Sequence, residues 1–408
     1  MKDNNIVVLH VFLDSLIFKG IADSFDSMQG VRNLYIFYTP IKGYRMQSNK
    51  DKRVIVTNDF ESYTSYFHSP EVDVIFFHSL PYSNYYLFDY IDNTKFVIWW
   101  AWGHDLYYKQ GRYLPLLTQK EMLKPLTKEF VHHYVNPETV TPTEKIISFF
   151  KKNSARVKYV LYKVIHYEKT YKPKKNQDEI LERIDAFYAP LDIEYEMMKQ
   201  AHHCFSARGD MKLGGPAIPN FEYKEKIGNI LVNHSLTETD NHLDVFEYLY
   251  KVKLGEDRKY ILPVSYGIGG NYNGNPDLLI NACQLNSRLT CWLKETMPFE
   301  DYKRIINTIS HAVFGMIRQQ ALGNVFMCLQ TGVKVYLFRN SIIYQELKKA
   351  GFICFSIEDD LTTDSLATCL TRDEAKINFD LFMKRKMGRF PTVFRKKMIQ
   401  AVEFKRKI

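Results

Sequence analysis

Residues 311–332 read HAVFGMIRQQALGNVFMCLQTG, and this stretch decides the fold. The apolar run at 312–317 predicts a buried parallel strand. A polar elbow at 318–320 follows, and apolar residues at helical spacing over 322–329 predict a helix. Residues 334–338 predict the next strand. A strand, an elbow, a helix and a second strand in this order make one unit of a parallel α/β sheet.

The elbow has the composition of a phosphate-binding turn. The first turn of the predicted helix would direct unpaired backbone N–H groups at the carboxyl edge of the sheet, which attracts anions. Arg318 adds a permanent positive charge, Gln319 and Gln320 can donate hydrogen bonds, and Gly323 lets a ligand approach the backbone. An ordinary strand–helix turn fits these residues equally well.

Composition predicts a two-domain globular protein. The chain has 408 residues, of which 46% are hydrophobic and 15% aromatic, which is enough for two cores. No stretch reaches the roughly 18 apolar residues of a membrane span, and no signal-peptide cleavage site is visible. The six cysteines are scattered without a Cys-x-x-Cys pair, which favours a reducing compartment and argues against a zinc site. We therefore expect a cytoplasmic protein.

Two basic segments predict an anionic partner. The formal net charge is +9, and residues 145–175 and 384–408 each contain ten Lys or Arg against one Glu, so the rest of the chain is acidic. This pattern indicates a membrane or a nucleic acid. The basic residues flank apolar ones and no nucleic-acid recognition module is visible, which favours peripheral attachment to the inner face of the cell membrane. The apolar residues of the tail fit packing on the first domain equally well.

Short apolar runs alternate with helical patterns along most of the chain. Those of the first half are 5–12, 34–38, 54–56, 72–77, 96–99, 186–189 and 203–206, and those of the second half are 229–233, 260–263, 288–293, 312–317 and 334–338. This alternation predicts two Rossmann-like domains. We place the first at 1–220 with a basic helical insertion at about 112–175, the second at 227–375, and a basic helical tail at 376–408.

Candidate catalytic residues follow strands of the first domain. A general base must be a carboxylate or an imidazole within reach of the proton that it removes. Asp105 lies beside Gly103 and Trp102, which fits a pocket with an aromatic wall, and it is the first candidate, before His78 and Asp210. The alternatives are a helix-capping Asp and a structural His. The sequence has no Asp-x-Asp motif, so we expect no metal ion to bridge the protein and the diphosphate of a bound substrate.

Several patches, taken in order, resemble glycosyltransferase family 56, the 4-acetamido-4,6-dideoxygalactose (Fuc4NAc) transferases of enterobacterial common antigen assembly. The patches are Phe76-Phe77-His78, 102–107, Arg208-Gly209-Asp210, 230–232 with Ser235 and His242, Pro263 with Tyr266, and 318–320 with Gly323. The resemblance as a whole covers about residues 5–355. Three features depart from the family pattern: Asn324 where we expect Thr, His104 where we expect Ala, and the length of the basic stretch at 145–175.

The resemblance implies an α/β protein of the GT-B type, with two Rossmann-like domains facing one another across a cleft. It implies inverting, metal-independent transfer from a dTDP-sugar, or alternatively a UDP-sugar, to an undecaprenyl-diphosphate-linked saccharide, with no cofactor. The expected donor-binding residues are Ser235, His242, Tyr266, Arg318, Gln319, Gln320, Gly323 and Asn324. The expected acceptor-binding residues are His10, Trp102, Gly103 and Arg208.

Three other functions remain open on the sequence. A sugar-nucleotide epimerase can share the two-domain fold, but its soluble substrate would not require basic amphipathic segments. A nucleic-acid-binding protein would account for the charge, and we expect no nucleic acid as partner for the reasons given above. A catalytically inactive scaffold is the third.

Overall fold

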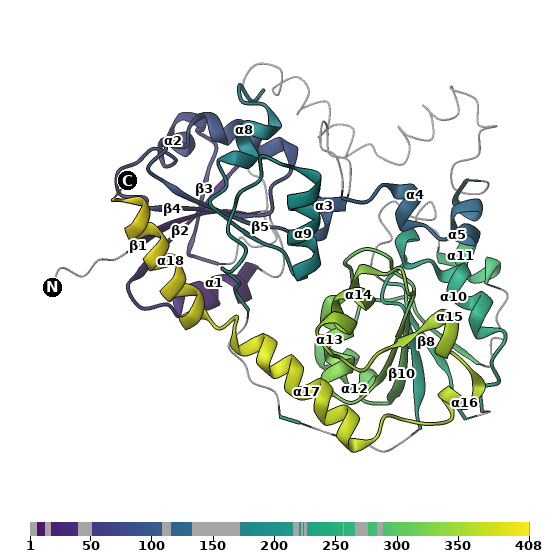
Figure 1. Cartoon of the computed structure of the whole chain (residues 1–408). Coiled ribbons are helices and arrows are strands. Elements are labelled where there is room, and N and C mark those ends of the chain that lie inside the picture. Colours follow the sequence, from purple (N-terminus) through teal and green to yellow (C-terminus); the bar gives the residue numbers. More distant parts are fainter. Residues whose placement is uncertain are drawn as a thin grey trace, which may run out of the picture. The chain divides into compact units, whose positions relative to one another are not determined.

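The computed structural model describes residues 6–12, 18–39, 51–107, 116–132, 172–214, 220–221, 223, 227–255, 257–265, 276–283 and 289–407. The chain divides into two compact units (Figure 1). The N-terminal unit comprises Met1–Leu116, Pro142–Ala217 and Lys386–Ile408, and the C-terminal unit comprises Leu117–Thr141 and Ile218–Arg385. Both units therefore contain segments that are distant in sequence, unlike the contiguous domains predicted above.

The N-terminal unit is built on one parallel sheet with the strand order β3-β2-β1-β4-β5-β6. Its strands are β1 (Ile6–Val11), β2 (Val31–Tyr38), β3 (Val54–Thr57), β4 (Val74–His78), β5 (Phe96–Trp100) and β6 (Ala186–Tyr188). Its helices are α1 (Phe18–Asp26), α2 (Phe60–Ser65), η1 (Tyr82–Asp89), α3 (Gly103–Tyr107), α8 (Gln177–Glu182), α9 (Asp192–Ala201) and α18 (Pro391–Lys405). Strands β1 and β4 are buried along their whole length, as expected for a sheet covered on both faces.

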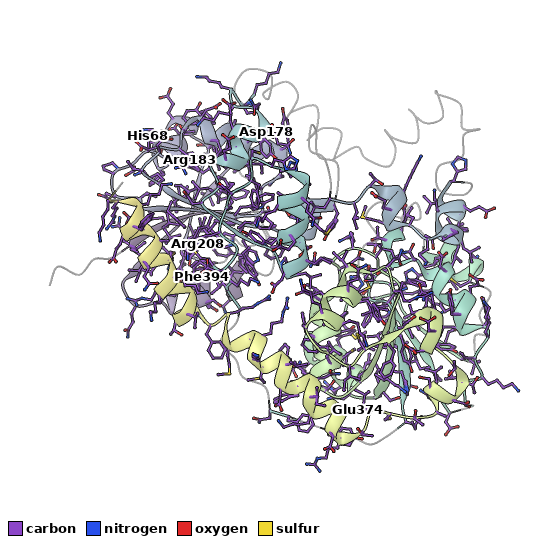
Figure 2. The ribbon with its side chains drawn as sticks, in the orientation of Figure 1. His68, Asp178, Arg183, Arg208, Glu374 and Phe394 are labelled. Atoms are coloured by element: carbon purple, nitrogen blue, oxygen red, sulfur yellow. The ribbon has the colours of Figure 1, made fainter. Side chains whose placement is uncertain are left out.

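Helix α18 returns from the end of the chain to complete the core of this unit. Its residues Phe394 (labelled in Figure 2), Met398 and Val402 are buried in a cluster with Val8 and Phe76 of the sheet. Figure 1 shows α18 alongside the strands of this unit. Of the two interpretations of the tail left open by the sequence, this packing favours attachment to the N-terminal unit over insertion of these side chains into a membrane. None of the helices within the described residues has the length and apolar character to cross a membrane.

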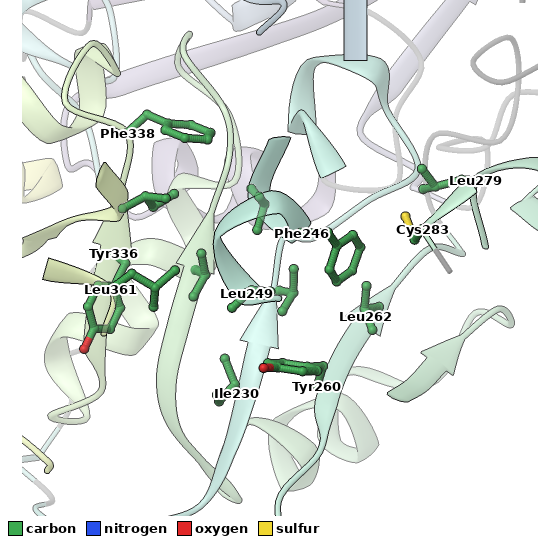
Figure 3. Packing of buried hydrophobic residues seen from close by; sticks show 14 of the residues in the cluster. Ile230, Phe246, Leu249, Tyr260, Leu262, Leu279, Cys283, Tyr336, Phe338 and Leu361 are labelled. Carbon is green, nitrogen blue, oxygen red and sulfur yellow. The ribbon is translucent and has the colours of Figure 1, made fainter. Parts of the chain in front are cut away.

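The C-terminal unit repeats the same topology with the order β12-β11-β10-β7-β8-β9. Its strands are β7 (Asn229–Val232), β8 (Tyr260–Pro263), β9 (Thr290–Leu293), β10 (Ile309–Phe314), β11 (Lys334–Leu337) and β12 (Phe355–Ser356). Its helices include α4 (Gln119–Met122), α5 (Pro125–Phe130), η3 (Glu238–Asp240), α10 (His242–Leu249), α11 (Pro276–Ala282), α12 (Phe299–Ile306), α13 (Leu322–Gln330), α14 (Ile342–Lys349), α15 (Ile357–Asp360), α16 (Thr363–Leu366) and α17 (Arg372–Met387). Figure 3 shows the core of this unit, where Phe246 and Leu249 of α10 pack over Ile230, Tyr260 and Leu262 of the sheet.

The segment that carries α4 and α5 belongs to the C-terminal unit, whereas the sequence placed it in an insertion of the first domain. The two carboxylate oxygens of Asp244 accept the backbone N–H groups of Leu126 and Thr127 at 2.9 Å each. A carboxylate at these first-turn N–H groups stabilises the start of α5. Asn241 adds a bond from the backbone N–H of Lys124 at 2.8 Å. The sequence assigned this segment to the wrong domain because these partners are more than a hundred residues away in sequence.

Two predicted strands also differ from the structure. Strand β10 begins at Ile309, three residues before the predicted start, because its polar residues are satisfied: Ser310 Oγ donates to Gly228 O at 3.2 Å, and His311 Nε2 lies 3.1 Å from Thr368 O. The run 203–206 forms no strand. Instead, Arg208 makes an isolated bridge to Ala186 of β6.

Candidate active site

In each sheet the strand order reverses at one point. Open α/β sheets bind ligands beside that point, at the carboxyl ends of the strands. The reversal lies between β1 and β4 in the N-terminal unit and between β7 and β10 in the C-terminal unit. Within the described residues, the non-glycine residues with positive φ are Ser79 (101°), Asn233 (58°), Asn241 (50°) and Ala321 (54°). All four lie in connections at these two carboxyl edges. Such backbone conformations cost energy and concentrate at functional sites.

In the C-terminal unit the elbow after β10 leads into the uncapped helix α13. Its N-cap residue is Ala321, whose side chain makes no capping hydrogen bond to the first turn. Those N–H groups carry the positive end of the helix dipole. Gly323 in this turn is exposed, and a Cβ there would meet no atom within 4 Å. The fold therefore does not require glycine at this position, which leaves free space beside the N–H groups.

Arg318 supplies a positive charge to the same elbow. Its side chain is buried, and its Nη1 donates to the backbone oxygen of Gln319 at 2.7 Å. Gln319 itself is half-buried, as is Asn324 in the first turn of α13. The elbow therefore combines a fixed cation, an amide side chain and unpaired N–H groups, which are the groups that bind a diphosphate.

A buried network behind the elbow is centred on Asp240. Its carboxylate accepts the Ser235 hydroxyl at 2.5 Å and the Thr237 hydroxyl at 3.0 Å, and it lies 3.1 Å from His234 Nδ1. Burial alone would raise the pKa of the Asp240 carboxyl, but the neighbouring histidines and the Ser235 hydroxyl lower it below its ordinary value. Gln320 joins this network through Thr237 Oγ1 at 2.6 Å. The network ties the turn after β7 to the turn after β10.

The structure thus separates the predicted donor-binding residues into two groups. Ser235 and Gln320 are buried in the network that joins the two turns, and His242 and Arg318 are also buried, whereas Gln319, Gly323 and Asn324 are exposed or half-buried. Tyr266 lies outside the described residues. Asp240 was missed by the sequence analysis, although it lies only five residues beyond Ser235.

In the N-terminal unit a pair of buried histidines occupies the corresponding edge. His78 is the last residue of β4, and its Nε2 lies 2.9 Å from Nδ1 of His10 on β1. Burial and the neighbouring His10 hold the pKa of His78 well below its ordinary value, and burial lowers that of His10 to about 4. Both imidazoles are therefore neutral at pH 7, with one lone pair each.

Three buried polar atoms at this edge have no hydrogen-bond partner among the described residues. They are Nδ1 of His78, Oγ of Ser79 and Nε1 of Trp102. Buried polar atoms are nearly always paired, so an unpaired group in a folded protein calls for an explanation such as a bound ligand or a catalytic role. The grouping of three such atoms beside the strained Ser79 makes this edge the candidate catalytic centre.

Asp105, the first sequence candidate for the base, holds the backbone at this edge. Its carboxylate accepts the backbone N–H of Leu80 at 2.8 Å, the indole N–H of Trp99 at 2.9 Å and the backbone N–H of Trp102 at 2.7 Å. Burial raises the pKa of the carboxyl to about 7, and these N–H donors oppose that rise. The carboxylate joins the turn after β4 to the turn after β5.

An aromatic wall continues from His78. Trp100 and Trp102 are both half-buried, with ring centroids 5.6 Å apart, and Trp100 stacks on Tyr188 at 5.4 Å. The ring of His78 lies 5.7 Å from that of Trp100. Gly103 follows directly as the first residue of α3. Aromatic walls with a few polar groups are typical of small-molecule sites.

Arg208 and Asp210 lie apart from this centre. Arg208 lines a cavity of about 680 Å³ with Thr94, Phe96 and Asp185, which precede or begin β5 and β6, so it lies toward the amino edge of the sheet, opposite the edge that holds His78. Asp210 pairs with Arg208 at 2.7 Å and with Lys397 at 3.3 Å, and Arg208 chiefly holds the pKa of its carboxyl at about 2. So weak a base is poorly suited to remove a proton from a hydroxyl group.

Residues 194–404 match the family described as 4-alpha-L-fucosyltransferase glycosyl transferase group 56. Three solved structures, at 9–11% identity, are similar along almost their whole length. The lipopolysaccharide outer core galactosyltransferase WaaB in its apo form has a TM-score of 0.51, with 9% identity over 98% of this chain and 99% of that one. A glycosyltransferase from Rickettsia africae has a TM-score of 0.52, with 11% identity over 99% of each chain. The structure described as trehalose-6-phosphate from E. coli bound with UDP-2-fluoro glucose has a TM-score of 0.52, with 10% identity over 97% and 98%.

At such low identity the solved structures show the fold alone, and they confirm the GT-B type with two Rossmann-like domains. The family match confirms the resemblance inferred from the sequence and decides for a transferase over an epimerase. Because the matched residues make up more than half of the 408 in the chain, the protein belongs to glycosyltransferase group 56 and is a glycosyltransferase of the GT-B fold.

Proposed function

We propose that the enzyme transfers a deoxyacetamido sugar such as Fuc4NAc from a dTDP-sugar to an undecaprenyl-diphosphate-linked saccharide, with inversion and without a metal ion. The family supports sugar transfer, and the resemblance described above supports this donor and this acceptor. The observation that carries the donor half is the uncapped N-terminus of α13 beside Arg318. As the bond between the anomeric carbon and the diphosphate breaks, these groups would take up the negative charge that a metal ion otherwise neutralises.

The acceptor half of the proposal centres on His78. The acceptor hydroxyl would lose its proton to the free Nδ1 of His78 while its oxygen attacks the anomeric carbon from the face opposite the diphosphate. Trp100 and Trp102 would hold the acceptor sugar, and Ser79 Oγ and Trp102 Nε1 would bind its polar groups. Asp105 takes a positioning role here, because its carboxylate already accepts three N–H groups.

Calorimetric titration of dTDP and UDP against Arg318→Ala tests the donor site. We expect the binding free energy to weaken by about 1.5–3 kcal/mol, the usual contribution of a charge-assisted hydrogen bond. Arg304→Ala is the matched control, because Arg304 is an exposed residue of α12 whose guanidinium pairs with Asp301. Unchanged affinity in Arg318→Ala, or an equal loss in Arg304→Ala, would remove the elbow from the donor site.

The choice of nucleotide and the absence of a metal requirement can be measured on the unmodified enzyme. A preferred base should raise the melting temperature most in a screen of nucleotides, because a ligand stabilises the folded state by RT ln(1 + [L]/Kd).

Within the described residues, no group of three or more His, Cys, Asp or Glu side chains is arranged to hold a metal ion. Turnover that disappears with EDTA and returns with Mg²⁺ or Mn²⁺ would contradict the metal-independent mechanism.

Attachment to the membrane is proposed from the sequence, because residues 145–171 of the basic segment lie outside the described residues. A polyprenyl-linked acceptor stays in the bilayer, and each cation near an anionic surface contributes about 1 kcal/mol. Changing Lys151, Lys152, Arg156 and Lys158 to Glu should abolish sedimentation with anionic liposomes and spare activity on a short-chain soluble acceptor. Undiminished sedimentation would show that this segment is not the membrane face.

A further inference from the structure

A chain of hydrogen bonds leads from the surface of α1 to the imidazole of His78. Asn33 on β2 donates from Nδ2 to Oδ1 of Asp26 at 2.9 Å, and its Oδ1 lies 3.0 Å from Nε2 of His10. Nδ1 of His10 in turn lies 2.9 Å from Nε2 of His78. The chain ends at Nδ1 of His78, which has no partner among the described residues.

The carboxylate of Asp26, at the surface end, fixes the direction of every hydrogen bond in this chain. An ionised carboxylate only accepts hydrogen bonds, so the Asn33 amide must present its NH₂ group to Asp26 and its oxygen to His10. An amide oxygen also only accepts, so the proton of neutral His10 is on Nε2. Nδ1 of His10 then carries a lone pair, and His78 must donate to it from Nε2. The remaining nitrogen of His78, Nδ1, is therefore the basic one.

Two further donors contact the carboxylate of Asp26. The hydroxyl of Tyr35 donates to Oδ1 of Asp26 at 3.0 Å, and Nη1 of Arg53 donates to Oδ2 at 2.7 Å. Reversing the histidine tautomers would require the Asn33 amide to flip, which would place its oxygen against the carboxylate of Asp26. That repulsion between two acceptors disfavours the reversed tautomers.

We propose that Asp26 and Asn33 are positioning residues that fix His78 as the Nε2–H tautomer, so that its Nδ1 is the atom that takes the proton of the acceptor hydroxyl. This rests on the role of His78 proposed above. In the transfer step the O–H bond of the acceptor breaks and an N–H bond forms at Nδ1 of His78. The Nε2–H of the resulting imidazolium still donates to His10, whose lone pair stabilises the new charge. The amide of Asn33 passes no proton onward, so the proton stays within the histidine pair.

The tautomer can be observed directly by NMR of the full chain labelled with ¹⁵N-histidine, with the signals of His78 assigned by their loss in His78→Gln. In the parent protein Nδ1 of His78 should be the unprotonated nitrogen and Nε2 the protonated one. Asp26→Asn should allow the Asn33 amide to flip and give a mixture of tautomers. Asp23→Asn is the matched control, because Asp23 lies on the same helix and contacts Arg53 at 2.9 Å without contacting Asn33.

The double variant Asp26→Asn with Asn33→Asp supplies a rescue. It restores an obligate acceptor opposite Nε2 of His10, so the Nε2–H tautomer of His78 should return. The rate of sugar transfer at saturating donor should fall in Asp26→Asn by the same factor as the population of that tautomer, and it should recover in the double variant.

The outcomes separate this inference from the proposed function. A parent His78 protonated on Nδ1, or an Asp26→Asn variant with an unchanged tautomer, would overturn the inference whatever the activity. A tautomer that shifts and recovers as described, with no change in the transfer rate, would uphold the control by Asp26 and remove His78 as the base.

Discussion

Oδ2 of Asp105 accepts the backbone N–H of Leu80 at 2.8 Å and so holds the turn that contains Ser79, whose φ is 101°. A non-glycine residue in this conformation persists only where the surrounding structure enforces it. Asp105 also binds the backbone of Trp102, so a single carboxylate fixes both turns that border His78.

Asp105→Asn should therefore destabilise the fold as well as reduce turnover. An amide has one acceptor oxygen and would turn its NH₂ group toward at least one of the three N–H donors. The unfolding free energy should fall by about 1–3 kcal/mol, the cost of an unsatisfied buried group. Chemical denaturation beside turnover assays measures both effects. A variant as stable as the parent but without turnover would instead support the sequence prediction that Asp105 is the base.

Gly323→Ala should separate stability from donor binding. A Cβ at this position meets no protein atom within 4 Å, and alanine is the better helix former, so the stability should stay constant or rise by up to about 1 kcal/mol. The added methyl group would occupy the space beside the first-turn N–H groups of α13, so the affinity for nucleoside diphosphates should fall. Thermal unfolding and calorimetry give the two values. An alanine variant that binds dTDP and UDP as tightly as the parent would exclude close approach of the diphosphate to this turn.

The buried histidines should make the enzyme sensitive to acid. Burial lowers the pKa of His10, His242 and His311 from 6.5 to about 4, so between these pH values the unfolded chain binds more protons than the folded one. Stability contributed by the neutral rings is therefore present above pH 6.5 and is lost as the pH falls toward 4. Each proton bound only by the unfolded state contributes a slope of about 1.4 kcal/mol per pH unit. In His311→Gln, the slope of the unfolding free energy against pH, measured by urea denaturation at several pH values, should be smaller by about that amount. An equal slope would show that His311 is protonated in the folded state.

The C-terminal helix α18 should behave as part of the core. Met398 is completely buried, so Met398→Ala should lower the unfolding free energy by about 2–5 kcal/mol. Lys396 is exposed on the same helix, and Lys396→Glu should change the unfolding free energy by no more than about 0.5 kcal/mol. If Met398→Ala is as stable as the parent and binds liposomes less well, the apolar side of α18 contacts the membrane.

Local pattern was sufficient to predict most strands and the elbow. Apolar runs of four to eight residues followed by helical spacing indicate parallel units whatever lies elsewhere in the chain. The start of β10 was misplaced because Ser310 and His311 look unsuited to a buried strand, and their partners Gly228 and Thr368 are distant in sequence. The strand expected at 203–206 is absent for the opposite reason, since Phe205 is buried although the run does not pair in the sheet.

The sequence by itself determined two parallel α/β units, the polar elbow before α13 and the kinds of residue that follow the strands, because these features depend on neighbours only a few positions away. Only the tertiary structure decided what each polar residue does. It gave Asp105 three N–H donors, placed His78 against His10, and directed Arg208 toward the other edge of the sheet. It also returned α18 to the N-terminal unit. Hydrogen-bond partners and burial are set by strand order and by packing between distant segments, and neither is encoded in the local spacing of residues.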